Sequence, residues 1–528
     1  MSHLDRRAFL ALSGAGVTAA LMGESPSTTS FAVNPFQLGS ASGDATTDSV
    51  ILWTRLAPSP TAPDFGMAGQ PDTVSVHWRI AESHEAVQSD ATSLYSGNVG
   101  ARKADAWSVH LEVKTAGGPL APGKQYYYQF SLPDGSYKAW IGQTRTAPRS
   151  TADVDPNFAV ISCQSAATDA SVNDGPSYWH GYTHLESNPV DFVVHLGDYI
   201  YRESHENTIP KDDYCTELVD YRRRWGWYLE RHNIQRVRRL YPMYAVPDDH
   251  EMYNDYQGAN IKPRFGEGTD WQLRSFNHGL RTYWENMPLR GGPPTAASGE
   301  DKLRFRLDRI GLNWGGNLDL ALLDCRQHRT APGAASPTLL GATQLAAATQ
   351  WINSSRATWT TLGVASPLSV YFASAGVPTS PTNWTAFPAE RRRITDALAA
   401  RRAAGGNPVV LAGDVHCPFA ARVIRSQNAA SKDFVATEFS TPSMSSYGFN
   451  WTSRRDANPD VFAWVGMRAD GTSRAQPQPL KGYLRCSATS TTFYTNFLAT
   501  HQTAISSGAV TSVAKFRTRT GTLGAVRY

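Results

Sequence analysis

The sequence predicts a mixed α/β fold for the larger, C-terminal part of the chain and an all-β fold for the part before it. After residue 158, apolar, β-branched runs alternate with segments of helical periodicity, and two of these runs end in glycine and aspartate. Between residues 36 and 146, short runs of strand character are separated by turn residues instead. Strands that alternate with helices are typical of layered α/β domains, and closely spaced strands are typical of β-sandwiches.

Length and composition limit the class of protein. A chain of 528 residues is too long for one ordinary core, so we expect two domains. The formal charge of +4, spread over this length, does not indicate nucleic-acid binding. Five cysteines are an odd number, so at least one is a thiol or a ligand, and the pairing of the other four is left open.

The N-terminus carries a candidate export signal. Asp5-Arg6-Arg7 precedes an apolar, small-residue stretch that ends near Met22. Paired arginines before such a stretch resemble a twin-arginine signal. The twin-arginine export machinery recognises this signal and transports proteins that are already folded. We therefore expect residues 1–32 to be a signal peptide and the mature protein to have no transmembrane helix. Its expected location is secreted, periplasmic or cell-wall associated, and the cleavage site is left open.

The all-β segment is predicted to span residues 33–148 as a sandwich of the immunoglobulin or fibronectin type. A linker over residues 149–157 follows, because prolines and small polar residues replace the strand pattern there. The α/β domain then covers residues 158–528. Its strands are predicted over residues 158–162, 190–195, 319–324 and 408–412, and its helices over residues 275–286, 343–361 and 388–404.

Polar side chains follow the predicted strands of the α/β domain. Ligands in such folds bind beyond the carboxyl ends of the strands. Asp198 alone is equally consistent with a helix N-cap, but the Gly-Asp pattern recurs at Gly413-Asp414, which favours a shared site. Gathered carboxylates need cations between them, and thiol, phenol and imidazole groups suit a transition metal. The strand ends offer Cys163; Asp198 with Tyr201; Asp249 with His250; Asp324; and Asp414 with His416.

Three of these motifs resemble those of the metallophosphoesterases, in the form used by the alkaline phosphatase D family. They are Gly197-Asp198-x-x-Tyr201, Asp249-His250-Glu251 and Gly413-Asp414-Val415-His416. Cys163 stands where the wider superfamily has its first aspartate, as in that family. Residues 36–44, 283–289 and 323–327 extend the resemblance over nearly the whole chain.

The resemblance implies a metallophosphoesterase-like α/β/β/α sandwich and a ligand set for two kinds of metal. His250 is expected to act as a catalytic residue beside the scissile phosphate. His278 is a further metal-ligand candidate, although a core or surface histidine fits equally well. Manganese or magnesium are alternatives to calcium. Ferric iron (Fe³⁺) is expected at Cys163, Asp198, Tyr201 and His416, and calcium (Ca²⁺) at Asp198, Asp249 and Asp414.

Other residues near these motifs leave more than one interpretation. Asp324 and Arg326 fit a structural ion pair, and Arg326 fits equally a bidentate contact to phosphate. His195 is more consistent with a satisfied buried histidine than with a ligand. The chain departs from the family at Asn254-Asp255, where paired asparagines are usual.

The predicted function is that of a secreted, metal-dependent phosphoric ester hydrolase, an alkaline phosphatase or phosphodiesterase. A metal-activated water or hydroxide is expected to attack phosphorus in a small-molecule phosphate ester. The alternative is a phospholipase D-like phosphodiesterase acting on a phospholipid. A non-catalytic cell-surface binding protein with a vestigial metal site is a more remote alternative. The sequence leaves open the preferred ester and the oligomeric state.

Overall fold

The computed structural model describes most of the chain. The predicted signal peptide lies almost wholly outside the described residues. Within the described part, no helix is both long and apolar enough to cross a membrane. The described residues are 30–528 without 166–178, 203–214, 257–268, 297–302, 305–310, 332, 370–371, 375–376, 379–382, 428–430, 447, 449–454, 457–458, 467–479 and 501–508.

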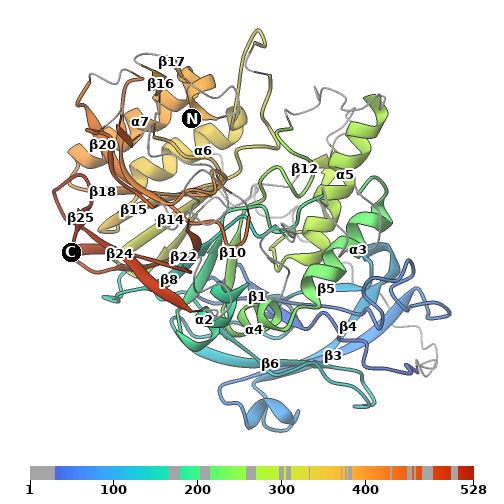
Figure 1. Cartoon of the computed structure of the whole chain (residues 1–528). Coiled ribbons are helices and arrows are strands. Elements are labelled where there is room, and N and C mark those ends of the chain that lie inside the picture. The colour runs from blue at the N-terminus through green and yellow to red at the C-terminus, as the bar shows by residue number, and fades with distance from the viewer. Residues whose placement is uncertain are drawn as a thin grey trace, which may run out of the picture.

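A ten-stranded sheet runs through the molecule (Figure 1). Its central strands β8, β9 and β10 are parallel, with His195 of β9 level with Ile161 on one side and Ala245 on the other. β1 extends this sheet by pairing in parallel with β10. The order is β25 (Val526–Arg527), β24 (Val510–Arg519), β23 (Thr492–Thr500), β22 (Lys481–Ala488), β8 (Asn157–Ile161), β9 (Phe192–His195), β10 (Met243–Ala245), β1 (Ser40–Gly43), β2 (Ile51–Arg55) and β5 (Ser108–Glu112).

The N-terminal segment divides its strands between two sheets. β1, β2 and β5 belong to the ten-stranded sheet, whereas a separate four-stranded sheet has the order β4 (Tyr95–Arg102), β3 (Thr73–Ala81), β6 (Gln125–Ser131) and β7 (Gly142–Arg145). Buried residues of both sheets, such as Leu52 and Trp78, lie in one continuous core. The N-terminal segment is therefore rich in strands, and β1, β2 and β5 lie in the same sheet as strands of the α/β part.

A seven-stranded sheet forms the second large layer. β14, β15, β18 and β20 are parallel, and β15 and β18 are buried along their whole length. Such near-continuous apolar runs are typical of parallel strands covered on both faces. The order is β13 (Gly311–Trp314), β14 (Leu318–Leu323), β15 (Trp359–Val364), β18 (Asn407–Ala412), β20 (Phe434–Ser440), β19 (Phe419–Ile424) and β21 (Phe462–Val465).

The two large sheets pack face to face with helices outside them (Figure 1). Phe493 of the ten-stranded sheet contacts Trp359 of the other sheet at a ring distance of 5.5 Å. Residues of α6 and α7 pack on the outer face of the seven-stranded sheet. The predicted mixed α/β class is confirmed. The helices are α1 (Val113–Ala116), α2 (His180–Ser187), α3 (Leu218–Leu229), α4 (His232–Leu240), α5 (Thr269–Asn286), α6 (Gly341–Ser354) and α7 (Pro388–Ala403).

Short strand pairs and 3₁₀ turns lie outside the three larger sheets. β11 (Thr295–Ala296) pairs with β12 (Leu303–Arg304), and β16 (Phe372–Ser374) pairs with β17 (Val377–Pro378). The 3₁₀ turns are η1 (Ala86–Gln88), η2 (Lys103–Asp105) and η4 (Trp384–Ala386).

The predicted helix over residues 343–361 is wrong in its last part. α6 ends at Ser354, and β15 begins at Trp359. The residues Trp359-Thr360-Thr361 are aromatic and β-branched, which favours a strand, and β15 pairs with both β14 and β18. The helical spacing of the preceding residues concealed this boundary.

Candidate metal centre

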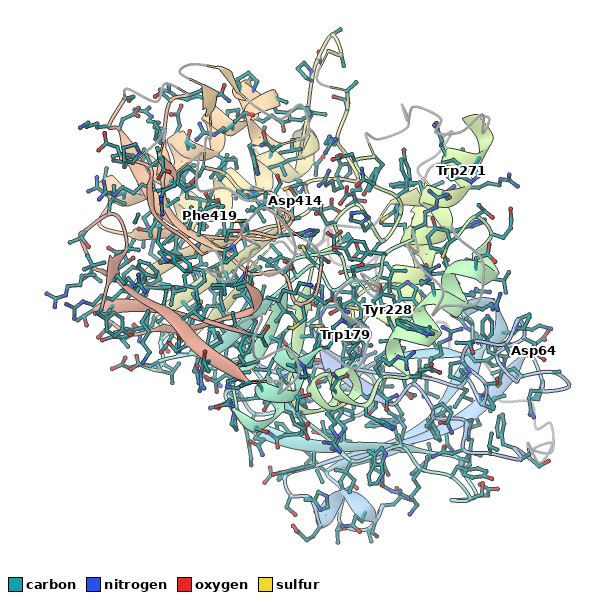
Figure 2. All side chains as sticks on the ribbon, in the orientation of Figure 1. Asp64, Trp179, Tyr228, Trp271, Asp414 and Phe419 are labelled. Atoms are coloured by element: carbon teal, nitrogen blue, oxygen red, sulfur yellow. The ribbon has the colours of Figure 1, made fainter. Side chains whose placement is uncertain are left out.

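The site lies where strands of both large sheets end. Cys163 follows β8, Asp198 follows β9 and Asp249 follows β10, whereas Asp414 follows β18 in the other sheet. Asp414 is labelled in Figure 2, in the upper middle of the view. Because parallel strands present their carboxyl ends at one edge, the fold brings these residues together from distant parts of the chain.

Three groups of potential ligands form at this edge among the described residues. In each group, one ligand atom of every residue lies within 4.8 Å of the others. Asp198 belongs to two groups, so a single carboxylate lies between a thiol-containing set and a set without sulfur. The groups are Cys163, Asp198 and His416; Asp198, Asp249 and His250; and Asp248, Asp249 and Asp414.

Tyr201 belongs to the same place as the first group. Its hydroxyl donates a hydrogen bond to Oδ2 of Asp198 at 3.1 Å and lies 3.1 Å from Nε2 of His416. Its ring stacks on the imidazole of His250, with ring centres 4.1 Å apart. The four residues predicted as iron ligands are therefore brought together, and His250 lies beside them.

The backbone is strained at the candidate ligand positions. Cys163, Asp198, Asp414 and His416 have φ values of 58°, 58°, 64° and 50°, in the left-handed region that non-glycine residues rarely adopt. Strained conformations of this kind persist only where the surrounding structure imposes them, and they are concentrated at functional sites. The turns after β8, β9 and β18 therefore hold their side chains in place at the cost of a relaxed backbone conformation.

Gly197 allows the turn after β9 and the turn after β10 to approach each other. Its φ is +89°, and a Cβ added there would lie 2.4 Å from Cβ of Asp248 and 2.6 Å from its backbone nitrogen. No side chain fits in that space. The glycine that ends the β9 run therefore sets the distance between the Asp198 turn and the turn that carries Asp248 and Asp249.

The carboxylates perturb one another. Burial raises the pKa of Asp248 well above its usual range, raises that of Asp249 and brings that of Asp414 to about 6. Asp198 is different: burial acts to raise its pKa, but His250, His416 and Arg326 outweigh burial and lower it. Burial, with Asp198, raises the pKa of the Cys163 thiol. Such a cluster favours cations close to it.

The donor set fits metal ions. Oδ1 of Asp249 is buried and accepts no hydrogen bond from any described residue, and Nη2 of Arg326 lies 3.5 Å from it. An orphaned carboxylate oxygen of this kind suits a hard cation such as calcium or magnesium. Thiol, phenol and imidazole around Asp198 suit a transition metal.

Arg326 does not pair with Asp324 through side chains. Oδ1 of Asp324 instead accepts the backbone N–H groups of Arg326 and Gln327. The Arg326 guanidinium is 1% exposed and contacts the carboxylates of Asp248, Asp249, Asp255 and Asp414. Of the two interpretations left open, the ion pair between Asp324 and Arg326 is therefore not formed. Asp255, where the chain departs from the family pattern, contacts both Arg326 and Asp249.

Two polar residues that sequence reasoning missed hold the site together. The buried carboxylate of Glu251 accepts the backbone N–H of Tyr199 at 2.7 Å and that of Asp248 at 3.0 Å, which ties the two ligand turns to each other. Ser446 donates a hydrogen bond from its hydroxyl to the Tyr201 oxygen at 2.6 Å. Glu251 lay in a recognised motif, whereas Ser446 gave no signal in the sequence.

The two other histidines lie apart from the ligand groups. Nδ1 of His278, on α5, is 3.1 Å from the carbonyl oxygen of Thr216, and His278 is in none of the groups formed by described residues. His195 is buried, accepts the Gly197 N–H on Nδ1 and contacts the ring of Tyr199, with the two rings tilted by 33°. Its interpretation as a satisfied buried histidine is confirmed. Burial lowers its pKa to about 3.

The cysteines form no disulfide. All five are buried, and each is unbridged. The bridges that the sequence left open among four of them are therefore absent. Cys163 alone lies in a ligand group of the described residues.

Comparisons with known proteins agree with this geometry. A sequence profile described as PhoD-like phosphatase matches residues 158–497, and one described as PhoD-like phosphatase, N-terminal domain, matches residues 23–148. Alkaline phosphatase D of Bacillus subtilis (strain 168) is 30% identical over 535 aligned positions, which cover 92% of this chain and 82% of that protein. A solved structure described as the structure of PhoD has a TM-score of 0.78 at 26% identity and covers 94% of this chain and 93% of its own. The chain therefore belongs to the PhoD-like phosphatase family and is a metal-dependent phosphoesterase.

Proposed function

We propose that this chain is an exported phosphatase or phosphodiesterase whose metals are ferric iron and calcium. Cys163, Asp198, Tyr201 and His416 would hold the iron, and Asp198, Asp249 and Asp414 would hold calcium. The observation that carries the proposal is the position of Asp198, which is shared between a group that contains a thiol and a group of carboxylate and imidazole ligands. A carboxylate in this position suits a bridge between two unlike metals.

When bound, such metals would supply positive charge to the phosphate oxygens and lower the pKa of a water molecule. The side chains of the protein have separate tasks. His250 stacks on Tyr201 and lies beside Asp198, so its imidazole is placed to stabilise charge on the substrate or to protonate the leaving oxygen. Ser446 and Asp198 fix the direction of the Tyr201 hydroxyl.

The substrate is proposed to be a small phosphate ester. The matched curated relative is named an alkaline phosphatase, which supports phosphomonoesters as the first class to test. Turnover of p-nitrophenyl phosphate and of bis-p-nitrophenyl phosphate on one preparation distinguishes monoester from diester preference. Failure on both by protein that contains metal would refute the proposed activity.

The metal assignment is tested by a matched pair of thiol variants. Cys163→Ala should lose iron and most of the activity. Cys486→Ala removes a buried thiol from β22, outside every ligand group, and should keep both. The measurement is iron and calcium per chain by elemental analysis, beside turnover. Full iron content in Cys163→Ala would exclude that residue as a ligand.

Export and domain organisation are part of the proposal. Residues 1–32 would be a twin-arginine signal, residues 33–148 a sandwich of the immunoglobulin or fibronectin type, and residues 158–528 the catalytic domain. The paired arginines Arg6 and Arg7 support the export route. Replacing both by lysine should retain the protein in the cytoplasm, as measured by cell fractionation, and unchanged export would refute the signal assignment.

A further inference from the structure

Arg326 is a buried cation among the carboxylates of the site. It follows β14, whereas the carboxylates around it follow β10 and β18. Its Nη2 lies 3.5 Å from Oδ1 of Asp249 and 3.3 Å from Oδ1 of Asp414. One guanidinium nitrogen therefore lies near two of the three proposed calcium ligands, Asp249 and Asp414, which follow strands of different large sheets.

Asp248 anchors this guanidinium. Nε of Arg326 donates to Oδ1 of Asp248 at 2.5 Å and Nη2 donates to Oδ2 at 3.4 Å, which is a bidentate contact. The side chain of Asp248 is 0% exposed and that of Arg326 is 1% exposed. A planar guanidinium held at two atoms has a fixed orientation, so its remaining donors point in fixed directions.

Without this cation the site would be crowded with negative charge. One oxygen from each of Asp248, Asp249 and Asp414 lies within 4.8 Å of the others. Like charges at this distance repel strongly in a buried environment. The guanidinium offsets this repulsion and gives Asp249 and Asp414 a common partner, so their spacing is set by the protein before a cation enters.

We propose that Arg326 is a positioning residue that holds Asp249 and Asp414 at the spacing a divalent cation requires, with Asp248 as its anchor. This inference rests on the proposed role of Asp249 and Asp414 as metal ligands. Arg326 acts through Asp249 and Asp414 and not on the phosphate. Its guanidinium is buried and already contacts four carboxylates, those of Asp248, Asp249, Asp255 and Asp414. Asp248 contributes to metal binding only through Arg326.

The chain offers a matched control in Arg391. Its guanidinium is also 1% exposed, but it donates to the backbone carbonyls of Leu368 and Ile424 and contacts no carboxylate of the site. Arg391→Lys should therefore lower the melting temperature without a change in metal affinity. Arg326→Lys keeps the charge but loses the planar fork, and Arg326→Met loses both.

The experiment is a calorimetric titration of the metal-depleted full chain with Ca²⁺ and, in parallel, with Mn²⁺, beside thermal unfolding. We expect Arg326→Met to weaken binding by about tenfold or more, as for other residues that orient metal ligands. Arg326→Lys should fall between this variant and the wild type. Asp248→Asn should weaken binding too, and the double variant Asp248→Asn, Arg326→Met should bind as Arg326→Met does, because the anchor acts through the arginine.

Several results would overturn the inference. One is binding by Arg326→Met that equals or exceeds the wild type, which would make the guanidinium only a competitor of the metal. Another is full additivity of the Asp248 and Arg326 substitutions. If Arg326→Met does not fold, Arg326→Lys and Asp248→Asn must each weaken binding more than Arg391→Lys does. A wild type that binds neither cation would instead refute the ligand assignment on which the inference rests.

Discussion

The carboxylate of Glu251 is the most informative group to perturb, because it joins two turns that carry candidate metal ligands. It accepts the backbone N–H of Tyr199, next to Asp198, and the backbone N–H of Asp248, next to Asp249. Glutamine has the same shape but only one acceptor oxygen. In Glu251→Gln, one of the two N–H groups must therefore face an amide NH₂ in a buried place.

The expected loss follows from this count. A buried backbone N–H without an acceptor costs about 1–3 kcal/mol of folding free energy. Separation of the two turns should also weaken divalent-metal binding by about tenfold or more. Burial, with Asp198, raises the pKa of Glu251 to about 8. The comparison is therefore made at about pH 9, where the wild-type carboxylate is ionised and accepts both hydrogen bonds.

Glu438 provides the control. It is also buried, and its carboxylate accepts two backbone N–H groups, those of Leu368 and Ser369, away from the site. Glu438→Gln should lose a similar free energy of unfolding, measured by chemical denaturation, and keep its metal affinity. Equal loss of metal affinity in both variants, or no loss of stability in Glu251→Gln, would refute the reasoning.

Three further substitutions test other features. Asp198→Asn should lower the content of both metals together, measured by elemental analysis, and loss of one metal alone would contradict a bridging role. Gly197→Ala should cost more stability than the left-handed conformation alone, which is about 1–2 kcal/mol, and should weaken metal binding; Gly405→Ala, at φ +87° with open space around it, gives the conformational cost by itself. His195 has a pKa lowered by burial to about 3, so the unfolded chain binds one more proton between about pH 6.5 and 3, and stability falls as the pH drops through that range. This contribution amounts to about 3 kcal/mol between about pH 7 and pH 4. His195→Asn keeps an acceptor for the Gly197 N–H and should show a smaller fall in denaturation experiments; equal falls would contradict the assignment.

The strands around the site were predictable because nearly all of their residues are apolar. β9 and β18 are short, apolar strands followed closely by a glycine. The aspartates after these glycines, Asp198 and Asp414, were identified from the sequence alone. The start of β15 was not predictable, because the helical spacing of apolar residues in α6 continues past its end into Trp359. Strand pairing was not predictable either, since β1 pairs with β10 across about two hundred residues.

Site residues were predictable from the sequence where their side chains are of a rare type at strand ends. They were not predictable where the residue type is common in loops. A thiol, a phenol and an imidazole at strand ends are unusual enough to identify Cys163, Tyr201 and His416. Ser446 is one serine in a loop rich in serine, and only the fold places its hydroxyl on Tyr201. Arg326 was identified, but its carboxylate partners follow β10 and β18, whereas the sequence indicated either an ion pair with the adjacent Asp324 or a contact to phosphate.

The position of β8 in the ten-stranded sheet has a consequence for how the chain folds. On one side β8 pairs with β9, but on the other it pairs with β22, where Leu484 is level with Val160, about 320 residues earlier in the chain. During synthesis, that edge of β8 has no partner until nearly the whole protein has left the ribosome. Contacts so distant in sequence form slowly, and unpaired edges promote aggregation. A chain released before residue 481 should therefore aggregate and not yield a partly active enzyme.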